Sequence, residues 1–255
     1  MAIKTHCLKF DPVDHSSTTG VRIEALLPGE VAGAAVDLIA IRGSDFRQSA
    51  AEGQIDVLLI LKGRARFRSQ AGSGRLGAEM IVRPSYNLGY DLPVEPDSAL
   101  WLLRVRRLLN EGDLEIVRND PGRYSELYLK RFSDCPVYTE EIKSAKSINR
   151  MILPEGWVPR FCMGSVFTPG PDRVEPHEHP MLDQLFFGLT ACRGVCYANG
   201  DRAELIENML LHVPLGSKHS LSAAEGDSLN YLWLDFFFTA EGQKYMDEQH
   251  TIVEE

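Results

Sequence analysis

Residues 166–188 read VFTPGPDRVEPHEHPMLDQLFFG, and two histidines in this stretch, His177 and His179, stand one residue apart. Alternate side chains of a β-strand point to the same face, so a strand here directs both imidazoles to one side. Two imidazoles on one wall can bind the same cation, whereas two histidines in a loop are hydrated or bonded to the backbone. The spacing therefore allows two interpretations, a metal site and a solvated loop.

Later residues favour the metal site. Gln184 precedes an apolar strand, LFFG, where an inward polar side chain needs a partner. The sequence PLGSKH places a turn before His219, which predicts a third imidazole from another strand. We therefore predict one divalent metal (zinc, manganese, iron or nickel) bound by His177, His179, Gln184 and His219. Asp183 is an alternative to Gln184, because a shift of one residue in strand register exchanges the two faces.

Short, β-rich runs separated by glycine and proline make up most of the chain, for example VDLIAIRG, ALWLLRV and NMLLHVP. Short helices are expected around 120–132 and 239–250. Similar strand and turn positions recur in order in both halves: Asp56, Pro84 and Trp101 in the first, and Asp183, Pro214 and Trp233 in the second. This repeat of a unit of about 100 residues predicts an all-β chain of two domains, 1–125 and 126–255.

The composition excludes several classes of protein. The chain of 255 residues has 27 basic and 36 acidic residues and a net charge of -9. No basic block stands out, so we expect no nucleic-acid partner.

Five scattered cysteines argue against a disulfide framework and favour the reducing cytoplasm. No apolar run nears the ~20 residues that cross a bilayer, and the first residues lack the apolar core of a signal peptide, so we expect a cytoplasmic protein without membrane contact.

The stretch PHEHPMLDQLFFGL (176–189) resembles the first motif of the cupin superfamily, and PLGSKH (214–219) is similar to the core of the second. The resemblance implies antiparallel jelly-roll barrels around a metal. The first half resembles a cupin that has lost its ligands, since IDVLLILKGRARF and IVRPSYNL contain no histidine. The whole therefore resembles a bicupin with a degenerate N-terminal barrel, and the likeness also implies a homodimer. Cupins usually have glutamate where this chain has Gln184, and a metal with four neutral ligands favours a small anionic substrate.

Two further stretches, RFCMGSVFTPGPDRVEPHEHP (160–180) and LNYLWLDFF (229–237), are similar to the bicupin ketol-isomerases of sugar acids, the deoxy-glucuronate and deoxy-hexosulose-uronate isomerases. The resemblance implies isomerisation of a uronate-like sugar acid through a metal-stabilised enediol. Lys218 and Tyr197 are the candidates for proton transfer or substrate contact. Two alternatives stay open. One is a cupin dioxygenase, or another metal-dependent lyase or hydrolase of a small organic acid, and the other is a non-catalytic, sugar-binding bicupin.

Overall fold

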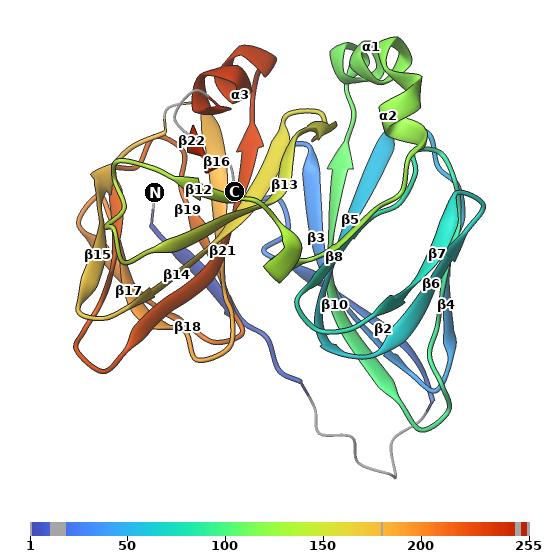
Figure 1. Cartoon of the computed structure of the whole chain (residues 1–255), viewed down its shortest axis with the longest axis horizontal. Helices are drawn as coiled ribbons and strands as arrows, with labels where there is room; N and C mark the ends of the chain where they lie inside the picture. The colour runs from blue at the N-terminus through green and yellow to red at the C-terminus, as the bar shows by residue number, and fades with distance from the viewer. Residues whose placement is uncertain (1, 11–18, 180, 248–250, 254–255) are drawn as a thin grey trace. The chain divides into compact units, whose positions relative to one another are not determined.

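The structure, a computed structural model, describes residues 2–10, 19–179, 181–247 and 251–253, and these form mainly antiparallel β-strands. The chain divides into two compact units (Figure 1). We call Phe10–Asp134 the N-terminal barrel, and Met1–Lys9 together with Cys135–Glu255 the C-terminal barrel. Each unit contains one larger and one smaller antiparallel sheet. The prediction of an all-β chain with two jelly-roll barrels and short helices is confirmed.

The N-terminal barrel pairs a six-stranded sheet with a four-stranded sheet. The larger sheet has the order β11-β8-β5-β10-β3-β2, with β11 (Tyr128–Arg131), β8 (Met80–Arg83), β5 (Gln54–Gly63), β10 (Ala99–Leu108), β3 (Ala34–Arg42) and β2 (Gly20–Leu26). The smaller sheet has the order β4-β9-β6-β7, with β4 (Asp45–Gln48), β9 (Tyr90–Pro93), β6 (Ala65–Ser69) and β7 (Gly72–Leu76). Apolar side chains from both sheets form its core, among them Leu58, Phe67 and Leu102.

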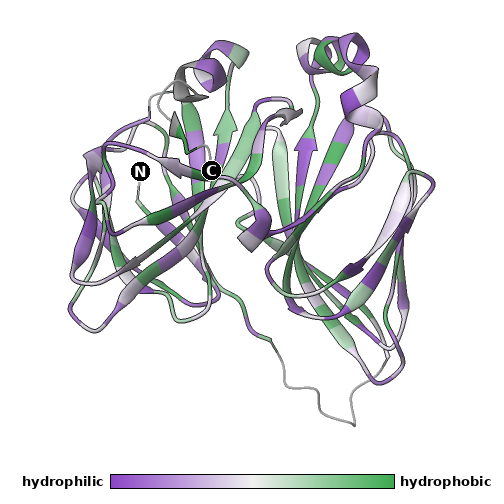
Figure 2. Cartoon of the chain, viewed as in Figure 1, coloured by the Kyte–Doolittle hydropathy of each residue, from purple (hydrophilic) through white to green (hydrophobic). Residues whose placement is uncertain are grey.

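The C-terminal barrel repeats this plan with an eight-stranded and a four-stranded sheet. The larger sheet has the order β1-β19-β16-β21-β14-β13-β12-β22, with β1 (Lys4–Cys7), β19 (Met209–Val213), β16 (Leu182–Gly188), β21 (Ser228–Phe237), β14 (Phe161–Pro169), β13 (Ile148–Val158), β12 (Val137–Thr139) and β22 (Thr251–Ile252). The smaller sheet has the order β15-β20-β17-β18, with β15 (Asp172–His177), β20 (His219–Ala223), β17 (Arg193–Ala198) and β18 (Asp201–Ile206). Coloured by hydropathy, the strands of both larger sheets are mostly apolar (Figure 2).

The two units differ from the predicted division after residue 125 in two ways. Strand β11 pairs with β8 through Tyr128 and Arg83, so the N-terminal barrel continues to Asp134. Strand β1 pairs with β19 along its whole length, so the first residues of the chain belong to the C-terminal barrel. Both differences arise because an edge strand joins whichever sheet offers it unpaired backbone groups, and sequence position does not reveal that choice.

Helices are few and short. Helix α1 (Glu111–Asn119) begins with a capping box, in which the Asn110 side chain accepts from the Asp113 N–H and the Asp113 carboxylate accepts from the Asn110 N–H, each at 2.9 Å. Helix α2 (Pro121–Ser125) is followed by β11, so only the first part of the helix expected at 120–132 exists. Helix α3 (Ala240–Asp247) lies within the helix expected at 239–250, of which residues 248–250 are outside the described ranges. Among the described helices, none has the length and apolar character needed to cross a bilayer.

Candidate metal centre

Three histidines meet on the smaller sheet of the C-terminal barrel. Strand β15 ends at His177 and β20 begins at His219, and the two residues are paired across the antiparallel strands. His179 follows two residues after β15. One ring nitrogen from each of the three lies within 4.8 Å of those of the other two. Because metal–nitrogen bonds of about 2.0–2.1 Å place tetrahedral ligands roughly 3.4 Å apart, small side-chain movements suffice for all three to bind one ion.

The hydrogen bonds of the imidazoles suit a metal ligand. The Nδ1 atom of His177 lies 2.7 Å from the carbonyl oxygen of Glu175, and Nδ1 of His219 lies 3.0 Å from that of Ser217. A carbonyl only accepts, so each Nδ1 carries the hydrogen and each Nε2 keeps a free lone pair. The buried Nε2 of His219 has no hydrogen-bond partner within the described residues. These residues therefore fit a divalent transition metal, and His177, His179 and His219 would hold it.

Burial favours the neutral form of two of the imidazoles, those of His177 and His219. It lowers the pKa of His177 and, together with the neighbouring His177 ring, lowers the pKa of His219 to about 4. A metal binds the neutral imidazole, and protonated rings compete with it. Because they are buried, the His177 and His219 side chains are in the form that can bind a metal at neutral pH.

Strand register separates Gln184 from Asp183. Gln184 lines the cavity beside the histidines, and its Nε2 donates to the Asp235 carboxylate at 2.7 Å. Its Oε1 is buried and accepts no hydrogen bond from the described part of the chain. The Asp183 carboxylate points to the other face of β16, where it lies 3.4 Å from Nε2 of His212. Gln184, not Asp183, is therefore the residue of β16 whose side chain faces the histidines.

The space between these side chains is small and mixed in character. Its volume is about 20 Å³, which is room for one water-sized group or ion. Apolar contributors include Phe186, Tyr231 and Trp233, and ionisable ones include Glu140, Lys143 and Asp235. The Lys143 ammonium lies 2.6 Å from the Glu140 carboxylate and donates to the Tyr138 hydroxyl, also at 2.6 Å. Both charged side chains are about nine-tenths buried or more, since they keep 6% and 9% exposure.

Asp235 is a buried carboxyl group without an ion pair among the described residues. It lies on β21 opposite Gln184, and its residue exposure is 2%. Burial raises the pKa of Asp235 to about 7, and the hydrogen bond from Gln184 only partly offsets this. A carboxyl group with this pKa can both take up and release a proton near neutral pH.

Sequence reasoning singled out two other side chains that do not line the cavity. Tyr197 lies on β17 between the buried Cys196 and Ala198, so its own side chain points outward and is 43% exposed. Lys218 is exposed in the turn before His219, and its N–H donates to Asn199. Three further ionisable side chains of the cavity were missed, because Glu140 and Lys143 lie far from both motifs in sequence and Asp235 lies within an apolar strand.

Solved structures with a similar arrangement of strands identify the fold of the whole chain. The chain aligns with a cupin 2 conserved barrel domain protein from Leptotrichia buccalis at a TM-score of 0.62 and 13% identity, over 92% of this chain and 96% of that one. The chain has a bicupin fold. An oxalate decarboxylase from Lactobacillus farciminis, solved as a formate complex, aligns with TM-score 0.63 and 10% identity over 87% and 82% of the two chains. Protein Ylba from E. coli aligns with TM-score 0.64 and 11% identity over 92% and 90%. At these identities, the likeness shows the bicupin fold alone.

Sequence comparisons add little to the bicupin assignment. No family model matches the chain. A stretch of 95 residues is 32% identical to the GMP synthase [glutamine-hydrolyzing] of Clostridium perfringens. The match covers 37% of this chain and 18% of that protein, so the chain spans less than a fifth of its length. A match this short shows no family membership.

The residue pairs across equivalent strands show which positions of the two barrels correspond to each other. In the C-terminal barrel, His177 of β15 is paired with His219 of β20. In the N-terminal barrel, the corresponding strands β4 and β9 pair Gln48 with Tyr90. Gln48 and Tyr90 therefore occupy the positions of His177 and His219 of the candidate metal site, and neither has an imidazole side chain.

The same comparison identifies the counterpart of Gln184. Gln184 is paired with Asp235 across β16 and β21, and Asp56 is paired with Arg106 across β5 and β10. Asp56 thus corresponds to Gln184, and the sequence repeat that aligned Asp56 with Asp183 was wrong by one residue. The error arose because Asp56 was aligned with Asp183 by residue type. The structural equivalence of two strand positions depends instead on which face of the strand each side chain occupies and on its cross-strand partner.

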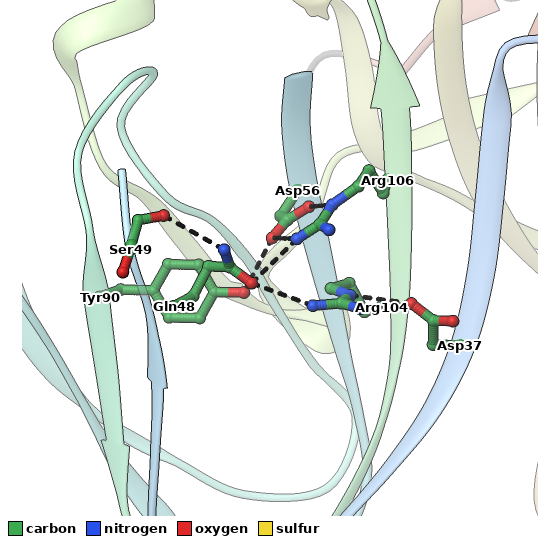
Figure 3. A network of polar contacts seen from close by, with 7 residues as sticks. All are labelled: Asp37, Gln48, Ser49, Asp56, Tyr90, Arg104 and Arg106. Carbon is green, nitrogen blue, oxygen red and sulfur yellow. Dashed lines mark hydrogen bonds and ion pairs between the residues drawn. The ribbon is translucent and has the colours of Figure 1, made fainter. Parts of the chain in front are cut away.

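At the equivalent place in the N-terminal barrel, the Arg106 guanidinium interacts with Asp56 and Gln48 (Figure 3). Arg106 donates to both oxygens of Asp56 at 2.7 and 2.9 Å and to the Gln48 side-chain oxygen at 2.9 Å. The Tyr90 hydroxyl donates to the same carboxylate at 3.0 Å. Arg104 forms a second buried ion pair with Asp37. The Arg106 guanidinium therefore contacts Gln48 directly and shares the Asp56 carboxylate with Tyr90, and these two residues are the counterparts of His177 and His219.

The pKa of Asp235 predicts a pH dependence of stability. Between the ordinary value of 3.8 and about 7, the folded state holds a proton that the unfolded state has released. The free energy of unfolding contributed by this group therefore falls as pH rises through that interval, by at most roughly 4 kcal/mol. The variant Asp235→Asn cannot titrate, so its stability minus that of the wild type should rise from pH ~4 to pH ~7 and then level off. Urea denaturation of EDTA-treated protein measures this difference.

The control for this titration is Asp201→Asn, which removes an exposed carboxylate from β18 of the same barrel. Its stability difference from the wild type should stay flat over the same pH range. A flat difference for Asp235→Asn as well would contradict the raised pKa.

Proposed function

We propose that the C-terminal barrel is a metal-dependent enzyme that moves a proton on a small organic acid. The observation that carries the proposal is the convergence of three imidazoles, those of His177, His179 and His219, beside a cavity that also contains a buried carboxyl group, Asp235. A divalent ion held by the histidines would act as a Lewis acid on a carbonyl oxygen and so acidify the adjacent C–H bond. Cupin-fold neighbours include an oxalate decarboxylase, which supports a small-molecule enzyme in general terms.

Asp235 is the general base of this proposal. Its pKa of about 7 allows it to accept a proton from the carbon next to the carbonyl and to return that proton to the neighbouring carbon. The Gln184 Nε2 donates to one carboxylate oxygen, which fixes the carboxyl plane and leaves the second oxygen for the substrate. The proton of the substrate's neighbouring hydroxyl moves to the former carbonyl oxygen through the enediol, so no atoms are gained or lost and the reaction is an isomerisation.

Substrate size follows from the cavity. Because about 20 Å³ accommodates one water-sized group, only the reacting end of a substrate enters, and the remainder lies beyond the half-buried His177 and His179. Phe186 and Trp233 shield the reacting end from water. Lys143 is neutralised by Glu140, so attraction of an anionic substrate depends on a divalent ion with neutral ligands.

The specific reaction we propose is the ketol isomerisation of a sugar acid. It is supported by the resemblance of residues 160–180 and 229–237 to the sugar-acid isomerases and by a proton carrier within the metal-site cavity. The test is anaerobic incubation of metal-loaded protein with a panel of hexuronates in D2O, followed by NMR. Isomer formation with deuterium at the carbon next to the carbonyl is the expected result.

Variants distinguish this reaction from its alternatives. Asp235→Asn should lower kcat by at least ~100-fold, the usual contribution of a general base. Asp183→Asn, the matched change on the opposite face of β16, should leave kcat within about threefold. Oxygen uptake with iron-loaded protein would show a dioxygenase instead, cleavage of the substrate would show a lyase or hydrolase, and binding without turnover would show a sugar-binding protein.

A further inference from the structure

A row of arginines lies on the outer face of the smaller sheet of the N-terminal barrel. Around β6 the sequence RARFR alternates exposed Arg64, Arg66 and Arg68 with the inward Ala65 and Phe67. Alternate residues of a strand share one face and are separated by roughly 6.6 Å. The three guanidiniums therefore project to the same side at regular intervals.

A fourth arginine faces this row from the neighbouring edge strand. Arg75 of β7 is paired directly with Arg66 of β6. Like charges at directly opposed positions destabilise a sheet. Within the described ranges Arg64, Arg66, Arg68 and Arg75 form no hydrogen bond or ion pair with protein groups. The strands thus retain an electrostatic cost that a bound anion would remove.

These arginines surround a groove of about 1020 Å³ that is formed by the N-terminal barrel alone. Arg131 adds a fifth guanidinium, Glu95 is the one carboxylate among its described lining residues, and Leu76 and Met80 contribute apolar surface. On a chain with a net charge of -9, this concentration of positive charge is local. Concave sites of this size accommodate small organic molecules.

We propose that this groove binds a small organic molecule that carries two or more phosphate groups. The planar guanidinium forms paired hydrogen bonds with phosphate oxygens, and several guanidiniums at fixed spacing favour several phosphates on one ligand. No aromatic side chain lines the groove among the described residues, and single-stranded nucleic acids are normally held by stacking on such rings. The proposal is independent of the metal site, which lies in the other barrel.

The probe for this site is fructose 1,6-bisphosphate, titrated into the full-length protein by calorimetry at constant ionic strength, with fructose 6-phosphate and fructose as comparisons. We expect one site per chain, at least tenfold weaker binding of the monophosphate, and no binding of fructose. The double variant Arg66→Gln/Arg75→Gln should bind the bisphosphate at least tenfold more weakly. Arg118→Gln, which removes an exposed arginine from α1, should bind like the wild type.

A second variant excludes misfolding as the cause of lost binding. Arg75→Glu places opposite charges across β6 and β7, so its melting temperature should rise while bisphosphate binding is lost. Three results overturn the proposal: no binding of the bisphosphate by the wild type, equal weakening in Arg118→Gln, or tighter binding of a single-stranded oligonucleotide that increases with its length. The last result would assign the groove to nucleic acid.

Discussion

The variant His219→Ala is expected to lose its bound metal, whereas the wild-type protein should contain about one divalent ion per chain. His219 contributes a buried Nε2 that has no protein hydrogen bond within the described residues, so its removal leaves the ion without the best-enclosed of its ligands. Substitutions of groups that only support a ligand weaken binding 10- to 100-fold, so loss of the ligand itself should weaken it at least ~100-fold. Elemental analysis and competition with a chelating dye measure both quantities. His177→Ala should behave in the same way.

Neighbouring variants test the choice of the fourth ligand. Gln184→Ala should weaken metal binding, because the buried Gln184 Oε1 accepts no hydrogen bond within the described residues and the side chain lines the same cavity as His177 and His179. Asp183→Ala should leave metal binding unchanged, because that carboxylate lies on the other face of β16. His6→Ala on β1 is the control for loss of a histidine away from the site. A folded wild-type protein that takes up no zinc, manganese, iron or nickel would remove the basis of the proposed enzyme.

The second large effect is expected in the N-terminal barrel. The variant Arg106→Leu should lower the free energy of unfolding by about 3–5 kcal/mol, because it leaves the Asp56 carboxylate buried without its counter-ion. The Asp56 side chain is only 6% exposed, so water cannot replace the guanidinium. Urea denaturation at neutral pH measures the loss.

A double-mutant cycle identifies the cause. Arg106→Leu/Asp56→Leu should recover most of the lost stability, since replacing both members of a buried ion pair with apolar groups is often close to neutral. Arg47→Leu is the matched control, because Arg47 pairs with Asp91 at the same 2.7 Å but is 79% exposed, and its loss should cost less than about 1 kcal/mol. Equal losses for Arg106→Leu and the double variant would show that the guanidinium acts by packing alone.

Local sequence patterns were sufficient for the fold and for part of the site. The strand predicted to carry both His177 and His179 ends at His177, but the three imidazoles come together as predicted. The histidine spacing and the turn before His219 could be recognised because each signal lies within a few residues. Asp183 and Gln184 could not be separated, because adjacent residues of a strand differ only in register, which the pairing with β21 decides. Glu140, Lys143 and Asp235 reach the cavity only through tertiary packing, so no local pattern could reveal them.

The cluster of positive charge on the N-terminal barrel could not be recognised from the sequence either. The arginines of β6 and β7 do not form a basic block in the sequence, because apolar residues separate them, and only the antiparallel pairing of Arg66 with Arg75 brings them together. The end of the helix expected at 120–132 was wrong for a related reason. Residues Tyr128–Arg131 join β8 as an edge strand, and that partner outweighs the weak helical preference of the segment.

The pairing of β1 with β19 has a consequence for biosynthesis. During translation Lys4–Cys7 leaves the ribosome long before its partner Met209–Val213, and in the interval the whole N-terminal barrel can fold. The segment Lys4–Cys7 can therefore dock only after Met209–Val213 has been synthesised. An expression fragment starting at residue 135 would leave the outer edge of β19 unpaired and prone to aggregation, whereas a fragment that also contains Lys4–Cys7 would keep that edge paired.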